Sequence, residues 1–189
     1  MKLIFATHNA NKFSEVKAML PEGYELISLT DLAYHDDIEE TANTIEGNAQ
    51  IKAETIAAHF GMPCFADDTG LEVDALNGAP GVRSARYAGE GKSDAANREK
   101  LLDQLKGKES RKAHFKTVIC YINGKEQESF TGICTGEILE RECGKGGFGY
   151  DALFVPTAHE KSFAEMSSEL KNKISHRALA FQKFIKSLA

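Results

Sequence analysis

The first seventy residues alternate short apolar runs with stretches of helical spacing. Residues 2–7 form an apolar run that predicts a buried strand. Residues 13–20 then place their apolar side chains on one face of a helix, which Pro21 ends. A second strand is predicted at 25–29, followed by a helix with a long apolar face at 45–60. This order of strands and helices is typical of an α/β protein.

The rest of the chain predicts a mixed sheet. Asn123-Gly124 is a strong hairpin signal, because both residues readily adopt the backbone angles of a tight turn between two strands. The predicted elements are a very short strand at 64–66, a helix capped by Ser93 and closed by Gly107, hairpin strands at 113–122 and 125–138, a strand at 152–155, and an amphipathic helix at 174–188. We therefore expect an α/β domain whose mixed β-sheet is flanked by helices.

Composition and charge narrow the classes of function. The chain of 189 residues is 42% hydrophobic and 27% charged, which is ordinary for a globular protein. Its net charge of −5 argues against nucleic acid as the main partner, but a few local cations suffice for a small anionic substrate. No apolar segment is long enough to span a bilayer or to resemble a signal peptide. The four cysteines form no CxxC pair, which favours free thiols in a reducing cytoplasm.

A first candidate site lies in the loop between the first predicted strand and the first predicted helix. Backbone N–H groups at a helix start lack partners within the helix, and the helix dipole is positive there. A phosphate group fits such a place, and Lys12 adds a cation. The alternative is a capped helix with a solvated lysine. The candidate residues are Thr7, His8, Asn9, Ala10, Asn11 and Lys12.

A second candidate site is the acidic pair Asp67-Asp68, which directly follows a short apolar strand. Adjacent carboxylates repel each other, but Mg²⁺ prefers carboxylate oxygens together with water and phosphate oxygens. One carboxylate is also able to take a proton from an attacking water. The alternative is an acidic turn helped by Gly70. The acidic run 36–40 is expected to be mostly solvated, with one or two members able to complete a metal site.

Two further groups of residues have a functional and a structural interpretation. Glycines in the loop 146–151 permit close approach of the backbone to a ligand, and its aromatic side chains are able to stack on a base. A plain β-turn explains the same loop. Lys171, Lys173, His176 and Arg177 cluster at the start of the predicted last helix. They form either a cationic wall for a phosphate or base, or a solvated face.

Taken together, the motifs resemble the Ham1 / inosine triphosphate pyrophosphatase family over essentially the whole chain. No single motif is decisive, but their joint order is very specific. The motifs are Thr7-x-Asn9-x-x-Lys12, Glu39-Glu40-Thr41, Asn48-Ala49, Ala66-Asp67-Asp68-Thr69-Gly70-Leu71, the segment Gly78 to Tyr87, Gly146-Gly147-Phe148-Gly149-Tyr150-Asp151, and Ile174-Ser175-His176-Arg177.

The resemblance implies a Mg²⁺-dependent pyrophosphohydrolase that cleaves ITP, dITP and XTP to the monophosphate and pyrophosphate. It also implies an ITPase-like fold with an elongated mixed sheet and two lobes around a central cleft, in a single domain over 1–189 that acts as a homodimer. Residues 7–12 would cradle the triphosphate. Asp68 matches the proton acceptor and a metal ligand, and Glu39 matches the second metal carboxylate, with Glu40 as the adjacent alternative.

The same resemblance assigns the remaining substrate contacts. They are Thr69, the base loop Phe148, Gly149, Tyr150 and Asp151, the substrate-binding Lys171, and the base-reading pair His176 and Arg177. Two positions depart from the pattern, since His8 stands where many members have Gly and Thr69 where many have Ser. The second change keeps the hydroxyl group.

Three other readings of the chain are open to test. A pyrophosphatase of the related Maf type would prefer pyrimidine or modified nucleotides, but the segments 148–151 and 175–177 favour the Ham1 type. A silent nucleotide sensor would be expected to lose groups such as Asp68, Lys12 and Lys171, which are present. An RNA-binding module conflicts with the acidic balance of the chain.

Overall fold

The structure is a computed structural model that describes residues 1–91 and 93–188. The chain forms two compact units. Unit 1 holds Met1–Asp68, Thr117–Gly132 and the C-terminal residues from Arg177, and unit 2 holds Thr69–Lys116 and Ile133–His176.

The described strands form one mixed sheet. They pair in the order β2-β1-β3-β5-β6-β7, and β4 also pairs with β3. β1 is parallel to β2 and β3, whereas β4 is antiparallel to β3 and β7 to β6. The predicted α/β class with a mixed sheet is therefore confirmed. The strands are β1 (Lys2–Phe5), β2 (Glu25–Ser28), β3 (Cys64–Val73), β4 (Pro80–Gly81), β5 (Lys112–Asn123), β6 (Glu126–Ile138) and β7 (Phe154–Pro156).

The helices begin and end close to the predicted residues, with one exception. The predicted helix at 174–188 corresponds to α5, and a separate helix α4 precedes it, because Ser175 is extended (ψ 156°) and its N–H bonds back to the Lys171 carbonyl. Lys171 and Lys173 therefore lie on a different helix from Arg177. The helices are α1 (Ala10–Met19), α2 (Ile45–Phe60), α3 (Asp94–Gln104), α4 (Ser168–Ile174) and α5 (His176–Ser187), with short 3-10 turns at Asp74–Leu76 and Ser84–Arg86.

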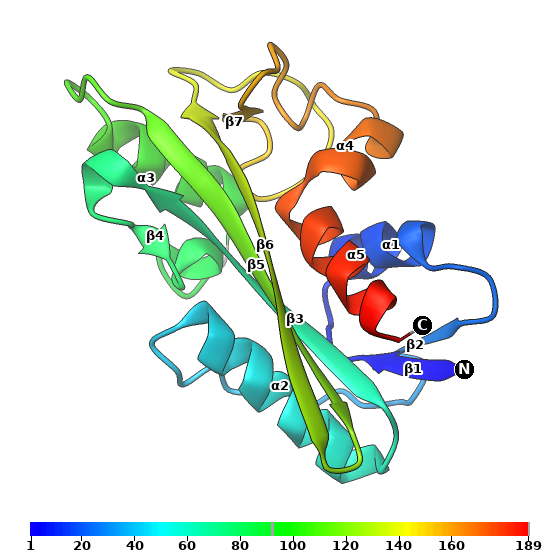
Figure 1. The fold of residues 1–189 in the computed structure, drawn as a ribbon. Helices are drawn as coiled ribbons and strands as arrows, with labels where there is room; N and C mark the ends of the chain where they lie inside the picture. The colour runs from blue at the N-terminus through cyan, green and yellow to red at the C-terminus, as the bar shows by residue number, and fades with distance from the viewer. Residues whose placement is uncertain (92, 189) are drawn as a thin grey trace. The chain divides into compact units, whose positions relative to one another are not determined.

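In unit 1, helices cover both faces of the strands. Figure 1 shows α2 on one side of β3 and the helices α1 and α5 on the other. The core on the α1 and α5 side is aromatic, and the rings of Phe5 and Phe65 stack at 4.6 Å between centroids. Its buried members are Leu3, Phe5, Val16, Phe65, Ile119, Tyr121, Ala180, Phe181 and Phe184.

Unit 2 has a core of its own, to which Leu101 of α3 and the C-cap residue Leu105 contribute. Three phenylalanines, Phe115, Phe154 and Phe163, pack at its centre with ring centroids 4.8 to 6.1 Å apart. The other buried members are Leu71, Val73, Ala113, Cys134, Ile138, Tyr150 and Leu153. This core lies beneath the loop that carries residues 146–151.

Strand β3 differs most from its prediction. The predicted strand at 64–66 is too short, because β3 continues through both aspartates to Val73, and the alternative of an acidic turn at the aspartates is therefore wrong. Its parallel neighbour β1 pairs with it only at Cys64 and Phe65. The acidic pair therefore lies just beyond the end of β1, and not at the end of its own strand. Positively charged side chains next to both aspartates offset the repulsion between the two adjacent carboxylates.

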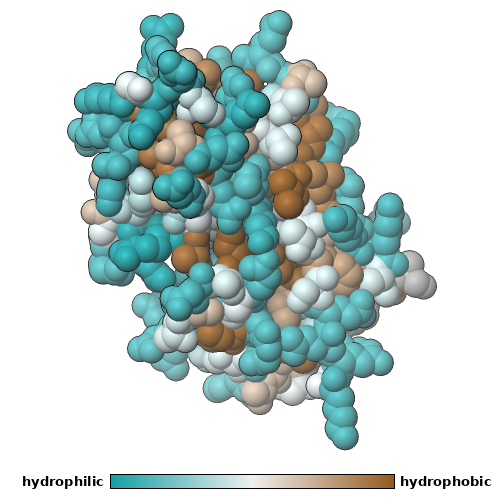
Figure 2. All heavy atoms as spheres, turned by 60° about the vertical axis from the view of Figure 1, so that its left-hand side comes forward, coloured by the Kyte–Doolittle hydropathy of each residue, from teal (hydrophilic) through white to brown (hydrophobic). Residues whose placement is uncertain are grey.

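The surface carries few large apolar side chains. Figure 2 shows a face on which hydrophilic residues predominate and hydrophobic ones form small groups. Among the described residues, the exposed large hydrophobics are Met1, Ile133 and Leu170. None of the described helices has the length and hydropathy needed to cross a membrane. All four cysteines, which lie in the described part of the chain, are free thiols as predicted.

Candidate active site

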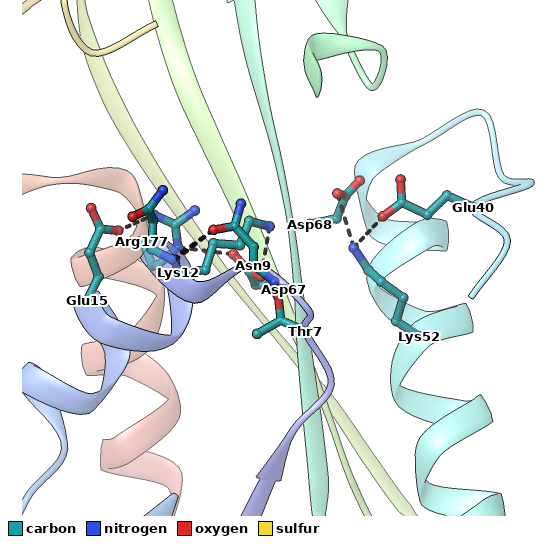
Figure 3. A network of polar contacts seen from close by, with 10 residues as sticks. Thr7, Asn9, Lys12, Glu15, Glu40, Lys52, Asp67, Asp68 and Arg177 are labelled. Carbon is teal, nitrogen blue, oxygen red and sulfur yellow. Dashed lines mark hydrogen bonds and ion pairs between the residues drawn. The ribbon is translucent and has the colours of Figure 1, made fainter. Parts of the chain in front are cut away.

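Asp67 lies at the centre of a buried ion cluster in unit 1. Its Oδ1 accepts a hydrogen bond from Lys12 Nζ at 2.9 Å, and its Oδ2 accepts one from Arg177 Nε at 3.1 Å. The other side of the Arg177 guanidinium pairs with Glu15 on α1. Both Asp67 and Arg177 have side chains that are only 2% exposed. Figure 3 shows this cluster on the α1 and α5 side of β3.

These cations keep Asp67 ionised. Burial alone would raise the pKa of the Asp67 carboxyl, but Lys12 and Arg177 outweigh burial and hold that pKa below its ordinary value. Both carboxylate oxygens are already bonded by these two side chains. Asp67 therefore serves to neutralise two buried cations, and is a poor candidate for accepting a proton during a reaction.

Asp68 points to the opposite face of β3, toward α2, as the alternation of a strand requires (Figure 3). Its Oδ1 lies 3.3 Å from Lys52 Nζ, which also bonds Glu40 Oε1 at 2.7 Å. Its Oδ2 is buried and has no hydrogen-bond partner within the described residues. Burial raises the pKa of Asp68, Lys52 opposes that rise, and the negative charges of Glu40 and Asp67 add to it.

The donor set around Asp68 suits a hard divalent cation. The described residues hold no group of three or more His, Cys, Asp or Glu side chains that could bind a metal by themselves. Mg²⁺, however, commonly binds one or two carboxylates and completes its shell with water and phosphate oxygens. Asp68 offers an unbonded oxygen, and Glu40 shares the Lys52 ammonium with it. Two carboxylates that already share one positive charge fit a Mg²⁺ ion that is also bound by phosphate.

The loop before α1 is more fully bonded than the sequence suggests. Asn9 caps α1, and its Oδ1 accepts hydrogen bonds from the N–H groups of Asn11 and Lys12 at 3.0 and 3.2 Å. The Asn9 N–H in turn bonds Thr7 Oγ1 at 3.2 Å. The expectation that these N–H groups are unpaired is wrong for Asn11 and Lys12, because the preceding asparagine is a strong N-cap.

The other predicted residues near this loop are exposed. Ala10 and Asn11 form the exposed first turn of α1. His8 is exposed, and its Nε2 lies 3.1 Å from the carbonyl oxygen of Asp36. Glu39 is exposed, whereas its neighbour Glu40 is half-buried on Lys52. The structure therefore brings Glu40, and not Glu39, next to Asp68.

A second buried ion pair lies in unit 2. Lys171 Nζ bonds Asp151 Oδ2 at 2.6 Å, and the two side chains are 7% and 6% exposed. The same Asp151 oxygen accepts the N–H of Phe148 at 2.9 Å. Lys171 Nζ lies 5.0 Å from the centre of the Phe148 ring, within the range of a cation–π contact. Three of the predicted substrate contacts, Phe148, Asp151 and Lys171, thus contact one another.

The glycine loop closes tightly around Asp151. At Gly147, which has a positive φ of 71°, a Cβ atom would lie 2.1 Å from Asp151 Oδ2, so only glycine fits. Gly149 also has a positive φ, and its N–H and carbonyl both bond side chains of α3. Tyr150 is buried, and its hydroxyl donates to the Ser84 carbonyl at 2.8 Å. The Tyr150 ring is thus fixed in the core beneath the loop.

The remaining predicted residues are divided between the two units. His176 belongs to unit 2, where its ring stacks on Phe115 with centroids 4.4 Å apart. Arg177 belongs to unit 1 and bonds Asp67. Thr69 is the first residue of unit 2 and is half-buried in β3. Lys171 pairs with Asp151 and Arg177 with Asp67, so the alternative of a solvated face is wrong for these two side chains.

Sequence reasoning missed Lys52 and Glu15, although each leaves a signal. The buried face of α2 includes Ile45, Asn48 and Ala49, and helical spacing places Lys52 on that same face. A lysine at a core-facing position needs a buried acidic partner, which predicts an ion pair. Glu15 follows Lys12 by three residues on α1, so the two charged groups are neighbours on the helix surface.

Comparison with known proteins gives a consistent result over the full chain. A model of the Ham1 family matches residues 3–187. A dITP/XTP pyrophosphatase of Christiangramia forsetii is 57% identical over 189 residues, which is 100% of this chain and 100% of that protein. A dITP/XTP pyrophosphatase of Flavobacterium psychrophilum is 51% identical over 185 residues, covering 98% of this chain and 97% of that protein.

Solved structures agree with the sequence comparison. The Ham1 protein of Staphylococcus aureus is 41% identical, with a TM-score of 0.89 and full coverage of both chains. A HAM1 protein of Coxiella burnetii is 36% identical, with a TM-score of 0.91 over 100% of this chain and 98% of that one. These values relate both the fold and the sequence to those proteins.

Proposed function

Because the chain belongs to the Ham1 family, we propose that it hydrolyses non-standard purine nucleoside triphosphates to the monophosphate and pyrophosphate. The substrates are ITP, dITP and XTP, and their removal cleanses the nucleotide pool. The names of the two relatives above support this activity. The structural observation that carries the proposal is Asp68, a buried carboxylate with one oxygen on Lys52 and the other unbonded.

Asp68 is the residue that we propose accepts the proton of the attacking water. The water oxygen forms a bond to the α-phosphorus, the bond from that phosphorus to the bridging oxygen breaks, and pyrophosphate leaves with the bonding electrons. The proton of the water passes to Asp68 Oδ2, which has no competing donor within the described residues and has two lone pairs, so the same oxygen is able both to hold a metal ion and to accept the proton. Lys52 holds the other oxygen and fixes the direction in which the carboxylate points.

The metal that we propose for this site is Mg²⁺. When bound, Mg²⁺ neutralises the negative charge of the phosphate oxygens and helps to orient them for in-line displacement. Asp68 would be one ligand. The second carboxylate is Glu39 by the family resemblance, whereas the contacts of unit 1 favour Glu40.

Glutamine variants of the two glutamates are expected to identify the second ligand. If Glu40 binds the metal, Glu40→Gln raises the Mg²⁺ concentration for half-maximal activity by about tenfold or more, since losing a group that supports a metal site costs that much. Glu39→Gln, a matched change at an exposed neighbour, leaves it near the wild-type value. Titration of pyrophosphate release with Mg²⁺ measures both. A larger effect of Glu39→Gln would assign the ligand to Glu39 instead.

The proposed substrate contacts fall into two groups, one for the triphosphate and one for the base. We propose that the segment Thr7–Lys12 and Thr69 bind the triphosphate, and that the loop 148–151, Lys171 and the pair 176–177 bind the base. Hypoxanthine and xanthine present an oxygen acceptor at C6, whereas adenine presents an amino donor. Donors such as His176, Arg177 or backbone N–H groups suit the oxygen and leave the adenine amino group facing other donors. Such hydrogen bonding supports strong discrimination, on the order of 10⁴ in favourable cases.

A nucleotide panel tests the reaction and the base selection together. We expect fast pyrophosphate release from ITP, dITP and XTP in the presence of Mg²⁺, and slow release from GTP, ATP and dTTP at the same low concentration. Guanine shares the C6 oxygen, so slow release from GTP requires a further contact near C2. The readout is pyrophosphate, measured beside the nucleoside monophosphate so that stepwise phosphate loss is distinguished.

Each other outcome of the panel would favour a different function or would contradict the proposed basis of selectivity. Preference for dTTP would favour the Maf type of pyrophosphatase. Tight ITP binding without release of pyrophosphate would indicate a sensor. Cleavage of ATP as efficient as that of ITP would refute the hydrogen-bond account of base choice. Filter binding at low salt tests the RNA-binding alternative.

The family resemblance also supports proposals on organisation. We propose that residues 1–189 act as a single ITPase-like domain, that the protein is a homodimer, and that it works in the cytoplasm on small nucleotides without nucleic acid or membrane as a partner.

A further inference from the structure

Two side chains of α3 hold both backbone groups of Gly149. Asp94 Oδ2 accepts a hydrogen bond from the Gly149 N–H at 2.7 Å. Arg98 Nη1 donates to the Gly149 carbonyl at 2.8 Å. Asp94 and Arg98 are four residues apart on one helix, so they lie on the same face and reach the same loop. Both contacts lie within unit 2.

The guanidinium of Arg98 is itself held in place. Its Nε forms an ion pair with Glu142 Oε1 at 2.9 Å, and its side chain is only 18% exposed. Glu142 lies a few residues before the glycine loop, so Arg98 joins the start of this segment to Gly149. The hydrogen bond from Arg98 Nη1 to the Gly149 carbonyl has a charged donor, and such a bond is stronger than one between neutral groups.

The loop has a physical need for such contacts. Gly149 has a φ of 59° and no side chain, and Gly144 and Gly147 also have positive φ angles. Glycines lose more conformational freedom on folding than other residues, so a loop built from them stays ordered only if other groups hold its backbone. Asp151 holds the Phe148 N–H from one side, and α3 holds Gly149 from the other.

We propose that Asp94 and Arg98 are positioning residues that set the base selectivity of the enzyme by fixing the loop 148–151. The inference rests on the proposed function, in which this loop binds the purine. Both side chains act through Gly149 and do not touch the nucleotide. Loss of either contact leaves the phosphate chemistry intact, but the loop then samples several conformations and discriminates less between a C6 oxygen and a C6 amino group.

The test uses Arg98→Met, which keeps the aliphatic stem, and Asp94→Ala, with Asp94→Asn as the conservative variant that keeps an acceptor oxygen. We expect the KM for ITP to rise about three- to tenfold in the first two, which is part of the roughly ten- to hundredfold that one hydrogen bond to a charged group is worth, because the loss acts on the substrate only through the loop. We also expect kcat to stay within about twofold, since the acceptor Asp68 is untouched. The ratio of kcat/KM for ITP to that for ATP falls, and Asp94→Asn restores part of both values.

Glu99→Ala is the control, because Glu99 is an exposed residue on the same helix. It should behave as wild type. Wild-type KM and selectivity in both Arg98→Met and Asp94→Ala would overturn the inference. A fall in kcat with unchanged KM would also overturn it, since that pattern indicates damage to the chemical step.

Hydrogen exchange of the free protein provides a readout that does not depend on activity. We expect faster amide exchange in residues 144–151 of Arg98→Met and Asp94→Ala, and no change in the exchange of α5. Faster exchange with unaltered KM and selectivity would refute the positioning role while leaving the proposed function standing. Failure of the wild-type enzyme to cleave ITP would instead refute the proposed function, and this inference with it.

Discussion

Asp68→Asn lowers kcat for ITP hydrolysis by roughly 10²- to 10⁴-fold, the usual contribution of a general base. Asparagine keeps the shape of the side chain and an oxygen for Lys52, but it cannot accept a proton from water. The free energy of unfolding should not fall, because burial and neighbouring acids raise the pKa of Asp68 and so disfavour its ionised form in the folded protein. Steady-state pyrophosphate release and urea unfolding measure the two effects.

The comparison for this variant is Lys52→Met, made in the otherwise wild-type enzyme. That change removes the ammonium that both Asp68 and Glu40 contact. Lys52→Met should lower activity while leaving the proton acceptor in place. Adding Asp68→Asn to Lys52→Met should therefore lower kcat further. Near-normal turnover of Asp68→Asn would remove Asp68 from the reaction.

Replacement of the neighbouring carboxylate, Asp67, is expected to affect mainly the stability of the protein, whereas Asp68→Asn affects mainly kcat. Asp67→Ala should lower the free energy of unfolding by about 3–5 kcal/mol, because removing one member of a buried ion pair leaves an uncompensated charge. In this case two buried cations, Lys12 and Arg177, lose their shared partner. Equilibrium unfolding in urea, with the slope checked against wild type, gives the difference.

Glu15→Gln is the matched comparison for the stability of this cluster. It removes a carboxylate from the same Arg177 but leaves Asp67 in place, and the Glu15 side chain is 16% exposed. Its loss of stability should therefore be smaller than that of Asp67→Ala. If the two variants were equally stable, or if Asp67→Ala matched Asp68→Asn, Asp67 would not be the centre of the cluster.

Most of the fold could be predicted from local patterns. The helix at 45–60 was predictable at both ends, because Thr44 caps its start and Gly61 adopts the left-handed conformation after its end. The break at Ser175 was not predictable, since apolar spacing continues through it and only the extended backbone of that residue separates α4 from α5.

At the candidate site, sequence patterns predicted the residues but not the separate role of each. The pattern of residues around Asp67 and Asp68 indicated an acidic site, but it did not separate their roles. That separation depends on which face of β3 each side chain takes and on cations from α1, α2 and α5, which are distant in sequence. Similarly, Asn9 and Lys12 were predicted to meet phosphate, whereas the competing bonds that they make within the chain became visible only in three dimensions.

The ion pairs on the two faces of β3 also fix the register of this strand. Asp67 meets Lys12 and Arg177 on one face, and Asp68 meets Lys52 on the other. Because a shift by one residue turns every side chain of a strand to the opposite face, a misaligned β3 would place a threonine against Lys52 if it slipped one way, and an alanine against Lys12 and Arg177 if it slipped the other way. Apolar residues alone penalise such a slip weakly where two faces are both buried, whereas these charges penalise it strongly. Insertions and deletions before Cys64 are therefore tolerated only if the preceding turn absorbs them.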